Sequence, residues 1–336
     1  MKDERVLLAH GSGGLLSQNL VEEVFKKHLS NPHLDDLLDG AMLQLPAKNI
    51  AVSTDSFVIT PLFFPGGDIG KLAVCGTVND LVACGARPLY LSAAFIIEEG
   101  FPITELRSIV ASMAETARLA GVKVVTGDTK VVEKGNADQI YINTTGIGVL
   151  ESKFILHPLR VQPGDQIIIT GPIGDHGLAI LAQRQGLAFS TPAVSDCAAL
   201  NRINSLTDMF PGQIKCMRDP TRGGLATVLN EIAAQSQRGM VVQEKQIPIS
   251  PVVRGACDML GMDPLYMANE GKMVIITGPE KAGQIVCQLR LLKETAGAEV
   301  IGEVVSEHPG MVLLETELGA KRILGALEGE HVPRIC

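Results

Sequence analysis

The chain has 336 residues, 46% of them apolar, and a formal net charge of −8. This length is enough for two ordinary domains with full hydrophobic cores. The negative charge argues against a nucleic-acid surface, which needs clustered Lys and Arg. The sequence has no apolar run long enough to span a membrane, and its acidic start leads into no signal sequence, so we expect no export. Seven cysteines at irregular spacings, with no Cys-x-x-Cys pair, favour reduced thiols in the cytoplasm over disulfides or structural zinc.

The first predicted element is a glycine cluster followed by a helix. Gly11, Ser12, Gly13 and Gly14 precede an amphipathic stretch that starts near Leu16. Glycines just before a helix leave several backbone N–H groups free to face an anion. A floppy N-terminus accounts for one such cluster equally well, so the cluster alone does not decide between the two interpretations.

Strands and helices then alternate through the first half of the sequence. The clearest helix covers residues 103–120, since its apolar residues recur at helical spacing, Pro102 precedes it and Gly121 follows it. Gly127 to Lys130 is interpreted as a polar segment that follows a strand. The full set of predicted elements is a strand at 50–53, a helix at 69–83, a strand at 89–97, a helix at 103–120, and strands at 122–125 and 139–150.

The second half repeats this mixture of strands and helices. A turn signal at Pro163-Gly164-Asp165 opens it. The predicted strands cover 166–170, 273–277, 299–305 and 311–315, and the predicted helices cover 178 onward, 196–209, 225–237 and 282–293. No long linker divides the chain. We therefore predict two α/β-type units that meet near residues 150–156.

Three aspartates lie beside glycines at strand ends or within a helix, namely Asp55, Asp80 and Asp128. Separated carboxylates that converge on one point are what Mg²⁺ needs when it bridges the phosphates of a nucleotide, and Lys71 and Lys130 are suited to neutralise phosphate oxygens. The chain has neither a Walker motif nor the dinucleotide-binding glycine fingerprint. Each aspartate alone is more often a cap or turn residue. Taken by themselves, these residues predict only a possible phosphate-binding site, whose loop matches neither of these known motifs.

The C-terminus offers one further chemical group, because the chain ends on Cys336. A thiol has an ordinary pKa of about 8.5, so a nucleophilic thiolate needs a nearby positive charge. Arg334 supplies one, and the terminal carboxylate opposes it. Taken alone, Cys336 is better interpreted as an incidental tail residue, since termini tolerate change.

Eight motifs and the C-terminal ending follow one another along nearly the whole chain. They are His10-Gly11-Ser12-Gly13-Gly14, Ser53-Thr54-Asp55-Ser56, Pro65-Gly66-Gly67, Asn79-Asp80, Thr126-Gly127-Asp128-Thr129-Lys130-Val131, Gly174-Asp175-His176-Gly177, Asp219-Pro220-Thr221-Arg222-Gly223-Gly224, Ala268-Asn269-Glu270-Gly271-Lys272 and Pro333-Arg334-Ile335-Cys336. Together they resemble the HypE family of hydrogenase maturation proteins, a branch of the aminoimidazole ribonucleotide synthetase and selenophosphate synthetase family. The cysteine ending is the most specific of these features. The selenophosphate synthetase branch carries a reactive cysteine near its N-terminus, whereas the first cysteine here is Cys75.

The resemblance implies a mixed α/β fold of two domains, in which the N-terminal domains of a homodimer pair into one β-barrel. We expect an ATP-binding and dimerisation domain at 1–153, a C-terminal α/β domain at 154–327, and a mobile tail at 328–336 that carries the terminal cysteine.

The activity implied by the resemblance is that of a carbamoyl dehydratase. A partner carbamoyltransferase, HypF, places a carbamoyl group on Cys336, and ATP with Mg²⁺ then drives its dehydration to a thiocyanate. The cyano group passes to iron in a complex of HypC and HypD, and becomes a ligand of NiFe hydrogenase. Neither a membrane nor a nucleic acid takes part.

Roles for individual residues also follow from the resemblance. Catalysis is assigned to Cys336, to Glu270 as the general base and to Lys130, which would hold the oxygen or phosphate as charge develops. Two alternatives stay open: a small-molecule kinase or synthetase of the same fold, and a thiol carrier without catalytic activity. The metal is assigned to Asp55, Asp80 and Asp128, and the nucleotide to Gly11, Ser12, Gly13, Gly14, Lys71, Asn79, Asp219, Thr221 and Arg222.

Overall fold

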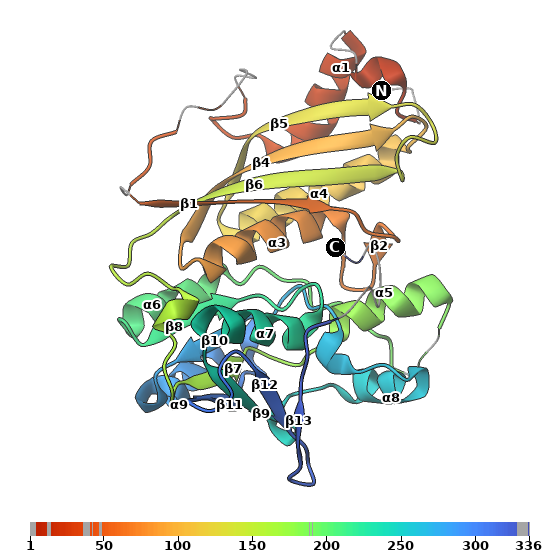
Figure 1. The fold of residues 1–336 in the computed structure, drawn as a ribbon. Coiled ribbons are helices and arrows are strands. Elements are labelled where there is room, and N and C mark those ends of the chain that lie inside the picture. Colours follow the sequence, from red (N-terminus) through yellow and green to blue (C-terminus); the bar gives the residue numbers. More distant parts are fainter. Residues whose placement is uncertain are drawn as a thin grey trace.

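The structure is a computed structural model, and it describes residues 5–11, 15–35, 41, 43–46, 49–187, 189, 191–327 and 335. Two sheets organise the described residues: a four-stranded sheet from the first half of the chain and a seven-stranded sheet from the second half. Figure 1 shows one above the other, with helix α3 at the junction between them. The predicted mixed α/β class is confirmed.

The four-stranded sheet has the order β1-β6-β4-β5, so β1 and β5 form its two edges. β4 pairs with β5 in parallel, and the other two pairings are antiparallel. The elements of this half are η1 (Leu8–Gly11), α1 (Leu15–Leu20), η2 (Val21–Lys26), α2 (Lys27–Leu29), β1 (Ile50–Phe57), β2 (Phe63–Phe64), β3 (Gly67–Asp68), α3 (Ile69–Ala83), β4 (Arg87–Glu98), α4 (Ile103–Ala120), β5 (Lys123–Val132) and β6 (Ile140–Val149).

The two long helices of this half begin and end where their capping residues predict. Asp68 precedes α3, and its carboxylate accepts hydrogen bonds from Gly70 N at 2.8 Å and Lys71 N at 3.2 Å, which satisfies two N–H groups of the first turn. Gly121 ends α4 with a φ of 71°, a left-handed conformation that glycine adopts without strain. The predictions of helices at 69–83 and 103–120 are confirmed.

One face of the four-stranded sheet is covered by helices α3 and α4, and no helix among the described residues covers the other, open face (Figure 1). The open sheet face is defined by side chains that the register brings side by side, among them Asp128 beside Ala94 and Asn143 beside Ser56. It carries apolar groups as well, because Val52 is 59% exposed and Ile96 is 43% exposed. A sheet face that exposes large apolar side chains among polar ones is a candidate contact surface.

The seven-stranded sheet has the order β13-β12-β9-β11-β7-β10-β8, and only its β12–β9 pairing is parallel. The elements of this half are η3 (Pro158–Arg160), β7 (Gln166–Ile169), α5 (Asp175–Gln185), η4 (Asn201–Asn204), α6 (Ser205–Met209), β8 (Ile214–Arg218), α7 (Gly224–Ser236), β9 (Gly239–Gln243), η5 (Glu244–Gln246), α8 (Pro251–Leu260), η6 (Pro264–Tyr266), β10 (Val274–Thr277), α9 (Pro279–Leu289), η7 (Lys293–Thr295), β11 (Glu299–Val305), β12 (Val312–Glu315) and β13 (Lys321–Ile323).

The predicted helix at 196–209 is wrong over its first part. Helical structure begins only at Asn201, and residues 192–200 form neither helix nor strand. The side chains of this segment bond to backbone groups instead, since Ser195 Oγ accepts a hydrogen bond from Cys197 N at 3.1 Å and Asp196 accepts one from Glu270 N at 3.1 Å. Such bonds compete with helix formation.

The strand predicted at 122–125 is too short, because β5 continues to Val132. Gly127 lies inside the strand, where a Cβ would collide with the carbonyl oxygen of Ala93 on β4. This glycine therefore permits close strand pairing, and it does not mark the end of the strand. Strands β8 and β9 and helix α8 were not predicted from the sequence.

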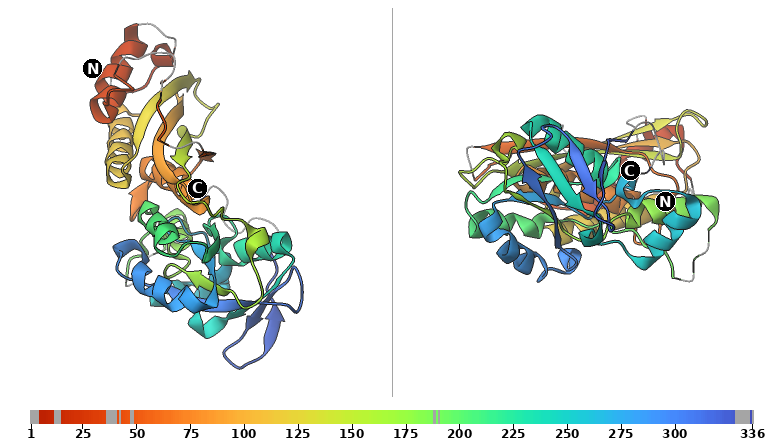
Figure 2. Two further views of the ribbon diagram at one scale, coloured as in Figure 1. Left: turned by 90° about the vertical axis from the view of Figure 1, so that its left-hand side faces the viewer. Right: turned by 60° about the horizontal axis from the view of Figure 1, so that its bottom comes forward.

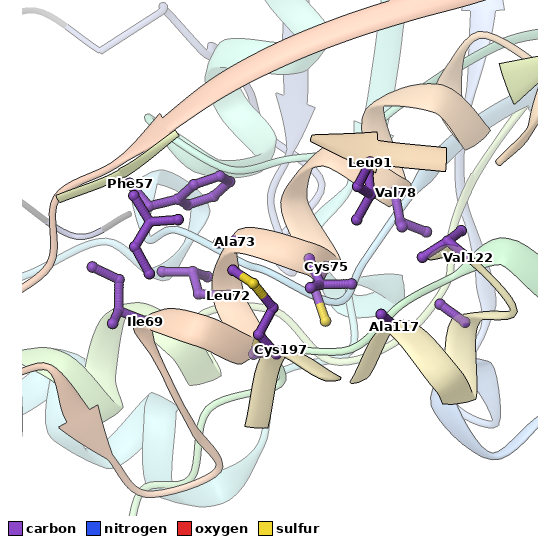
Figure 3. Close-up of a cluster of buried hydrophobic side chains, with 14 of the residues drawn as sticks. Phe57, Ile69, Leu72, Ala73, Cys75, Val78, Leu91, Ala117, Val122 and Cys197 are labelled. Carbon is purple, nitrogen blue, oxygen red and sulfur yellow. The ribbon is translucent and has the colours of Figure 1, made fainter. Parts of the chain in front are cut away.

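The two halves share one hydrophobic cluster across the junction. It joins Phe57 and Leu72 to Met273 and Ile180 of the second half, all buried. Figure 3 shows Cys197 beside Cys75 of α3 among these side chains, and the left view in Figure 2 shows both lobes packed end to end. Among the described residues, no helix is both long and apolar enough to cross a bilayer.

Candidate active site

An acidic pocket of about 560 Å³ lies at the junction and takes its lining from both halves. Asp55 comes from β1 and Asp80 from α3, whereas Asp219 follows the end of β8. The residues that line the acidic pocket are Thr54, Asp55, Gly76, Asp80, Arg218, Asp219, Thr221, Arg222, Gly223, Thr227, Val228, Glu231, Glu270 and Leu327.

A tight turn brings polar groups to one end of this pocket. β8 ends at Arg218, and Thr221 N donates a hydrogen bond to Asp219 O at 3.0 Å, which closes the turn before α7. Gly223 then takes a φ of 76°, so the chain enters α7 through a left-handed residue. The first N–H groups of a helix attract anions, and Thr221 and Arg222 precede α7 on the pocket side.

The carboxylates of the acidic pocket raise one another's pKa. Burial raises the pKa of Asp219 to about 7, and the negative charge of Asp80 adds to this. Burial also raises the pKa of Asp80; a hydrogen bond of 2.6 Å from Ser53 lowers it, and nearby Asp55 raises it. This crowding of negative charge is the electrostatic setting that a divalent cation relieves.

Glu270 is the most deeply buried acid of the pocket, at 3% exposure. Its Oε1 has no hydrogen-bond partner among the described residues. Burial raises its pKa well above the usual value, and the charges of Asp219 and Asp196 raise it further. A strongly shifted pKa in a cleft marks a candidate acid–base group, and the unpartnered oxygen is ready to contact a ligand atom.

The structure brings together six residues that the sequence assigned to chemistry, namely Asp55, Asp80, Asp219, Thr221, Arg222 and Glu270, all on the acidic pocket. It separates Asp128 and Lys130 from them. These two form an exposed ion pair of 3.3 Å on β5, and they line a different cavity, of about 830 Å³, together with His10 and Gly11.

Two further predicted nucleotide ligands have protein partners in this structure. Lys71 Nζ donates to Gly66 O at 2.7 Å. The Asn79 amide donates to Ala198 O at 3.0 Å and to Glu270 O at 3.3 Å, and its oxygen accepts from Leu200 N at 2.8 Å. Asn79 therefore joins the two halves. The predicted residues Ser12, Gly13, Gly14 and Cys336 lie outside the described residues.

The acidic pocket suits a magnesium ion that arrives with phosphates. Among the described residues, no three His, Cys, Asp or Glu side chains are arranged to hold a metal by themselves. Mg²⁺ keeps several waters and is bound through one or two carboxylates plus substrate phosphates. Asp55 and Asp80, with Arg222 nearby, match that pattern.

Comparison with known proteins identifies the family. The N-terminal domain of AIR synthase related protein matches residues 38–150, and the C-terminal domain matches residues 162–314. The carbamoyl dehydratase HypE of Rhodobacter capsulatus is 48% identical over 338 residues, which cover 100% of this chain and 99% of that protein. The chain belongs to the HypE family. A crystal structure of a HypE with ATP has 49% identity and a TM-score of 0.95, covering 98% of this chain and 99% of that one. A HypE–HypF complex has 47% identity and a TM-score of 0.81, covering 92% and 99%.

Sequence reasoning gave no role to several residues that surround Glu270 in this HypE family member. Asp196 accepts hydrogen bonds from Glu270 N and Gly271 N, and it forms a buried ion pair of 3.2 Å with Lys272. Lys272 belongs to one of the family motifs, whereas no sequence pattern singled out Asp196. Only the fold brings Asp196 to the residues around 270.

Proposed function

We propose that this chain is a carbamoyl dehydratase, which uses ATP to convert an S-carbamoyl group on Cys336 into a thiocyanate. The family supports the activity, since the similarity to carbamoyl dehydratases covers the whole chain. The observation that carries the proposal is the buried carboxylate of Glu270, with an unpartnered oxygen, at a pocket of acidic and phosphate-binding residues.

The reaction has two steps. ATP transfers its terminal phosphoryl group to the carbamoyl oxygen, the amide loses one N–H proton, and ADP leaves. The phosphate then departs with its oxygen as the second N–H proton is removed, which leaves a C≡N group on sulfur. Glu270 is the proposed base for these protons, because its buried carboxylate has an unpartnered oxygen at the acidic pocket, and the raised pKa strengthens it as a base once it is ionised.

Nucleotide binding is assigned to both cavities. Thr221 and Arg222, just before α7, bind phosphate oxygens. Asp219 orients these two residues, because its carbonyl oxygen accepts the hydrogen bond from Thr221 N. Asp55 and Asp80 would hold Mg²⁺, which would supply charge neutralisation for phosphoryl transfer. Lys71, Asn79 and the Gly11, Ser12, Gly13 and Gly14 segment complete the proposed set. ATP binding by a HypE at 49% identity supports this assignment.

A homodimer is the proposed assembly. The open sheet face and the unpaired edges of β1 and β5 are surfaces that a second copy can cover, because closing two such sheets into one barrel removes the edges. In such a dimer Asp128 and Lys130 serve a site to which the partner contributes. Lys130 then holds the developing charge on the carbamoyl oxygen or phosphate.

One partner protein and one partner complex are proposed, and the chain is proposed to act in the cytoplasm. HypF supplies the carbamoyl group, which a solved HypE–HypF complex at 47% identity supports. A HypC–HypD complex receives the cyano group for the iron of NiFe hydrogenase. The proposed division of labour is an ATP-binding and dimerisation domain at 1–153, a second domain at 154–327 and a mobile tail at 328–336.

ATP hydrolysis tests the proposal against its alternatives. Hydrolysis should require Mg²⁺ and should appear only when Cys336 is carbamoylated. A small-molecule kinase would hydrolyse or transfer without that thiol, and a carrier would not use ATP. Cys336→Ala should abolish hydrolysis, whereas Cys287→Ala, at an exposed free cysteine, should not. Equal hydrolysis by both variants would contradict the proposal.

A further inference from the structure

The residue before the terminal cysteine is held inside the protein. Ile335 is 5% exposed and belongs to the hydrophobic cluster of the junction. Its carbonyl oxygen lies 2.7 Å from Nε2 of His176, which is fully buried at the start of α5. His176 is part of the Gly174-Asp175-His176-Gly177 motif, to which the proposed reaction assigns no role.

The partners of His176 define its tautomer. A carbonyl oxygen only accepts hydrogen bonds, so Nε2 must carry the proton that it donates to Ile335. Nδ1 of the neutral ring then accepts from the hydroxyl of Ser195, 2.8 Å away. The ring also meets the edge of Phe64 at 5.5 Å. Both ring nitrogens of His176 are thus engaged, and its one N–H points at the carbonyl oxygen of Ile335.

We propose that His176 is the positioning residue of the C-terminal tail, which it anchors through the Ile335 carbonyl so that the modified Cys336 faces the dehydration site. This inference rests on the proposed function. His176 does not touch the reacting atoms and acts only through the tail.

The anchor and the base are held by consecutive residues. Ser195 bonds to His176, and the next residue, Asp196, accepts hydrogen bonds from the backbone N–H groups of Glu270 and Gly271. One short segment therefore fixes the tail anchor relative to the proposed base. Cys336 follows Ile335 directly, and consecutive Cα atoms are about 3.8 Å apart, so holding the Ile335 carbonyl limits where the thiol can lie.

A second observation concerns Leu327 and Ile335, the described residues on either side of segment 328–334. Leu327, the last described residue before the tail, lines the acidic pocket, and its N–H donates to Thr227 Oγ1 at 3.3 Å. The described residues on both sides of segment 328–334 thus pack at the junction of the two halves. A bond to the backbone of Ile335 also tolerates every chemical form of the neighbouring thiol, whether free, carbamoylated or cyanated.

The test is the reactivity of Cys336 with iodoacetamide, read by mass spectrometry of the C-terminal peptide. His176→Phe keeps a ring of similar size and removes the N–H donor. We expect Cys336 to be alkylated at least several-fold faster in this variant, with the exposed Cys287 as the internal reference. His176→Gln keeps a donor, so it should restore part of the protection.

Kinetics separate an anchoring role from a general structural one. In His176→Phe the carbamoyl transfer from HypF to Cys336 should proceed at least as fast as in the wild type, whereas thiocyanate formation should slow at least several-fold. Ile335→Asp disrupts the same anchor from the tail side, and it serves if the His176 variants do not fold. It should give the same pattern.

Unchanged alkylation of Cys336 in a folded His176→Phe or Ile335→Asp protein would overturn the anchor. The alkylation assay needs no carbamoyl chemistry, so it can succeed even if the proposed function fails. A wild-type protein that never forms a thiocyanate would instead overturn the proposed function and leave the anchor standing.

Discussion

Asp55 and Asp128 lie on opposite edge strands of the four-stranded sheet, and their side chains leave opposite faces of it. Asp55 lies opposite Thr144, Thr144 lies opposite Ala93, and Ala93 lies opposite Gly127, so these four residues share one face. Asp128 follows Gly127 directly and therefore belongs to the other face. Three strand spacings amount to about 14 Å, and side chains alternate between the faces along each strand. One chain therefore cannot bring both carboxylates to one Mg²⁺, and a role for Asp128 in metal binding requires a second copy.

The first prediction concerns this second copy. Val52→Lys puts a charge on the open sheet face, where the native side chain is 59% exposed. Because burial of an unpaired charge in an interface is costly, the variant should be monomeric at concentrations where the wild type is a dimer in light scattering. Leu318→Lys, at a 97% exposed position of the second half, is the control and should stay dimeric. A monomeric wild type would contradict the dimer.

The second prediction concerns complementation between two inactive variants in one dimer. Asp80→Asn and Asp128→Asn should each lose ATP use and stay folded, since an amide keeps the shape of the carboxylate and removes its charge. If each site takes Asp80 from one subunit and Asp128 from the other, mixing and re-forming dimers should restore about a quarter of wild-type activity, because half of the dimers contain one intact site. Recovery of none would show that the two residues do not act in one shared site.

The third prediction tests Asn79 as a link between the two halves. Asn79→Ala leaves the buried Leu200 N–H and the carbonyl groups of Ala198 and Glu270 without their side-chain partner, so the free energy of unfolding should fall by about 1–3 kcal/mol. Asn136→Ala removes an exposed amide that bonds only within its turn, and it should change stability by less than about 0.5 kcal/mol. Urea unfolding measures both. Equal effects of the two substitutions would argue against the link.

The sequence predicts local structure well where a single element carries its own signals. Helices 69–83 and 103–120 are examples, because Asp68 precedes the first, Gly121 ends the second, and neither helix contains a proline. It fails where distant residues decide the outcome. Residues 196–200 look helical, but the Asp196 side chain bonds to the backbone of Glu270 and Gly271, more than 70 positions later, and the segment forms no helix.

The same limit applies to the candidate site. The carboxylates Asp55, Asp80 and Glu270 were identifiable from family motifs, and the fold brings them to one pocket. Their separation from Asp128 was not predictable from the sequence, because it depends on strand order and on which face of the sheet each side chain occupies. The link from His176 to Ile335 spans 159 positions, and no local pattern signals it.

The fourth prediction follows from the raised pKa of Glu270. The folded protein holds a proton on Glu270 that the unfolded chain releases above a pH of about 4.3, so the wild type loses stability as the pH rises towards the folded-state pKa. In Glu270→Gln the amide side chain at this position has no titratable proton. The variant should therefore gain stability over the wild type as the pH increases, while it loses dehydration activity.

Urea unfolding of both proteins at about pH 5.5 and about pH 8.5 measures this difference, which should be larger at the higher pH. Asp165→Asn is a useful comparison, because burial also raises the pKa of Asp165, which is remote from the acidic pocket; it should leave dehydration unaffected. A stability difference for Glu270→Gln that stays constant with pH would show that Glu270 is ionised in the folded protein throughout.

The most direct test of the central claim is mass spectrometry of the C-terminal peptide after incubation with HypF, its carbamoyl donor and Mg²⁺-ATP. Cys336 should first gain one carbamoyl group, and this group should then lose one water. In Glu270→Gln the carbamoyl group should remain and no water should be lost. Modification of any of the other six cysteines with Cys336 unmodified, or loss of water without ATP, would contradict the account.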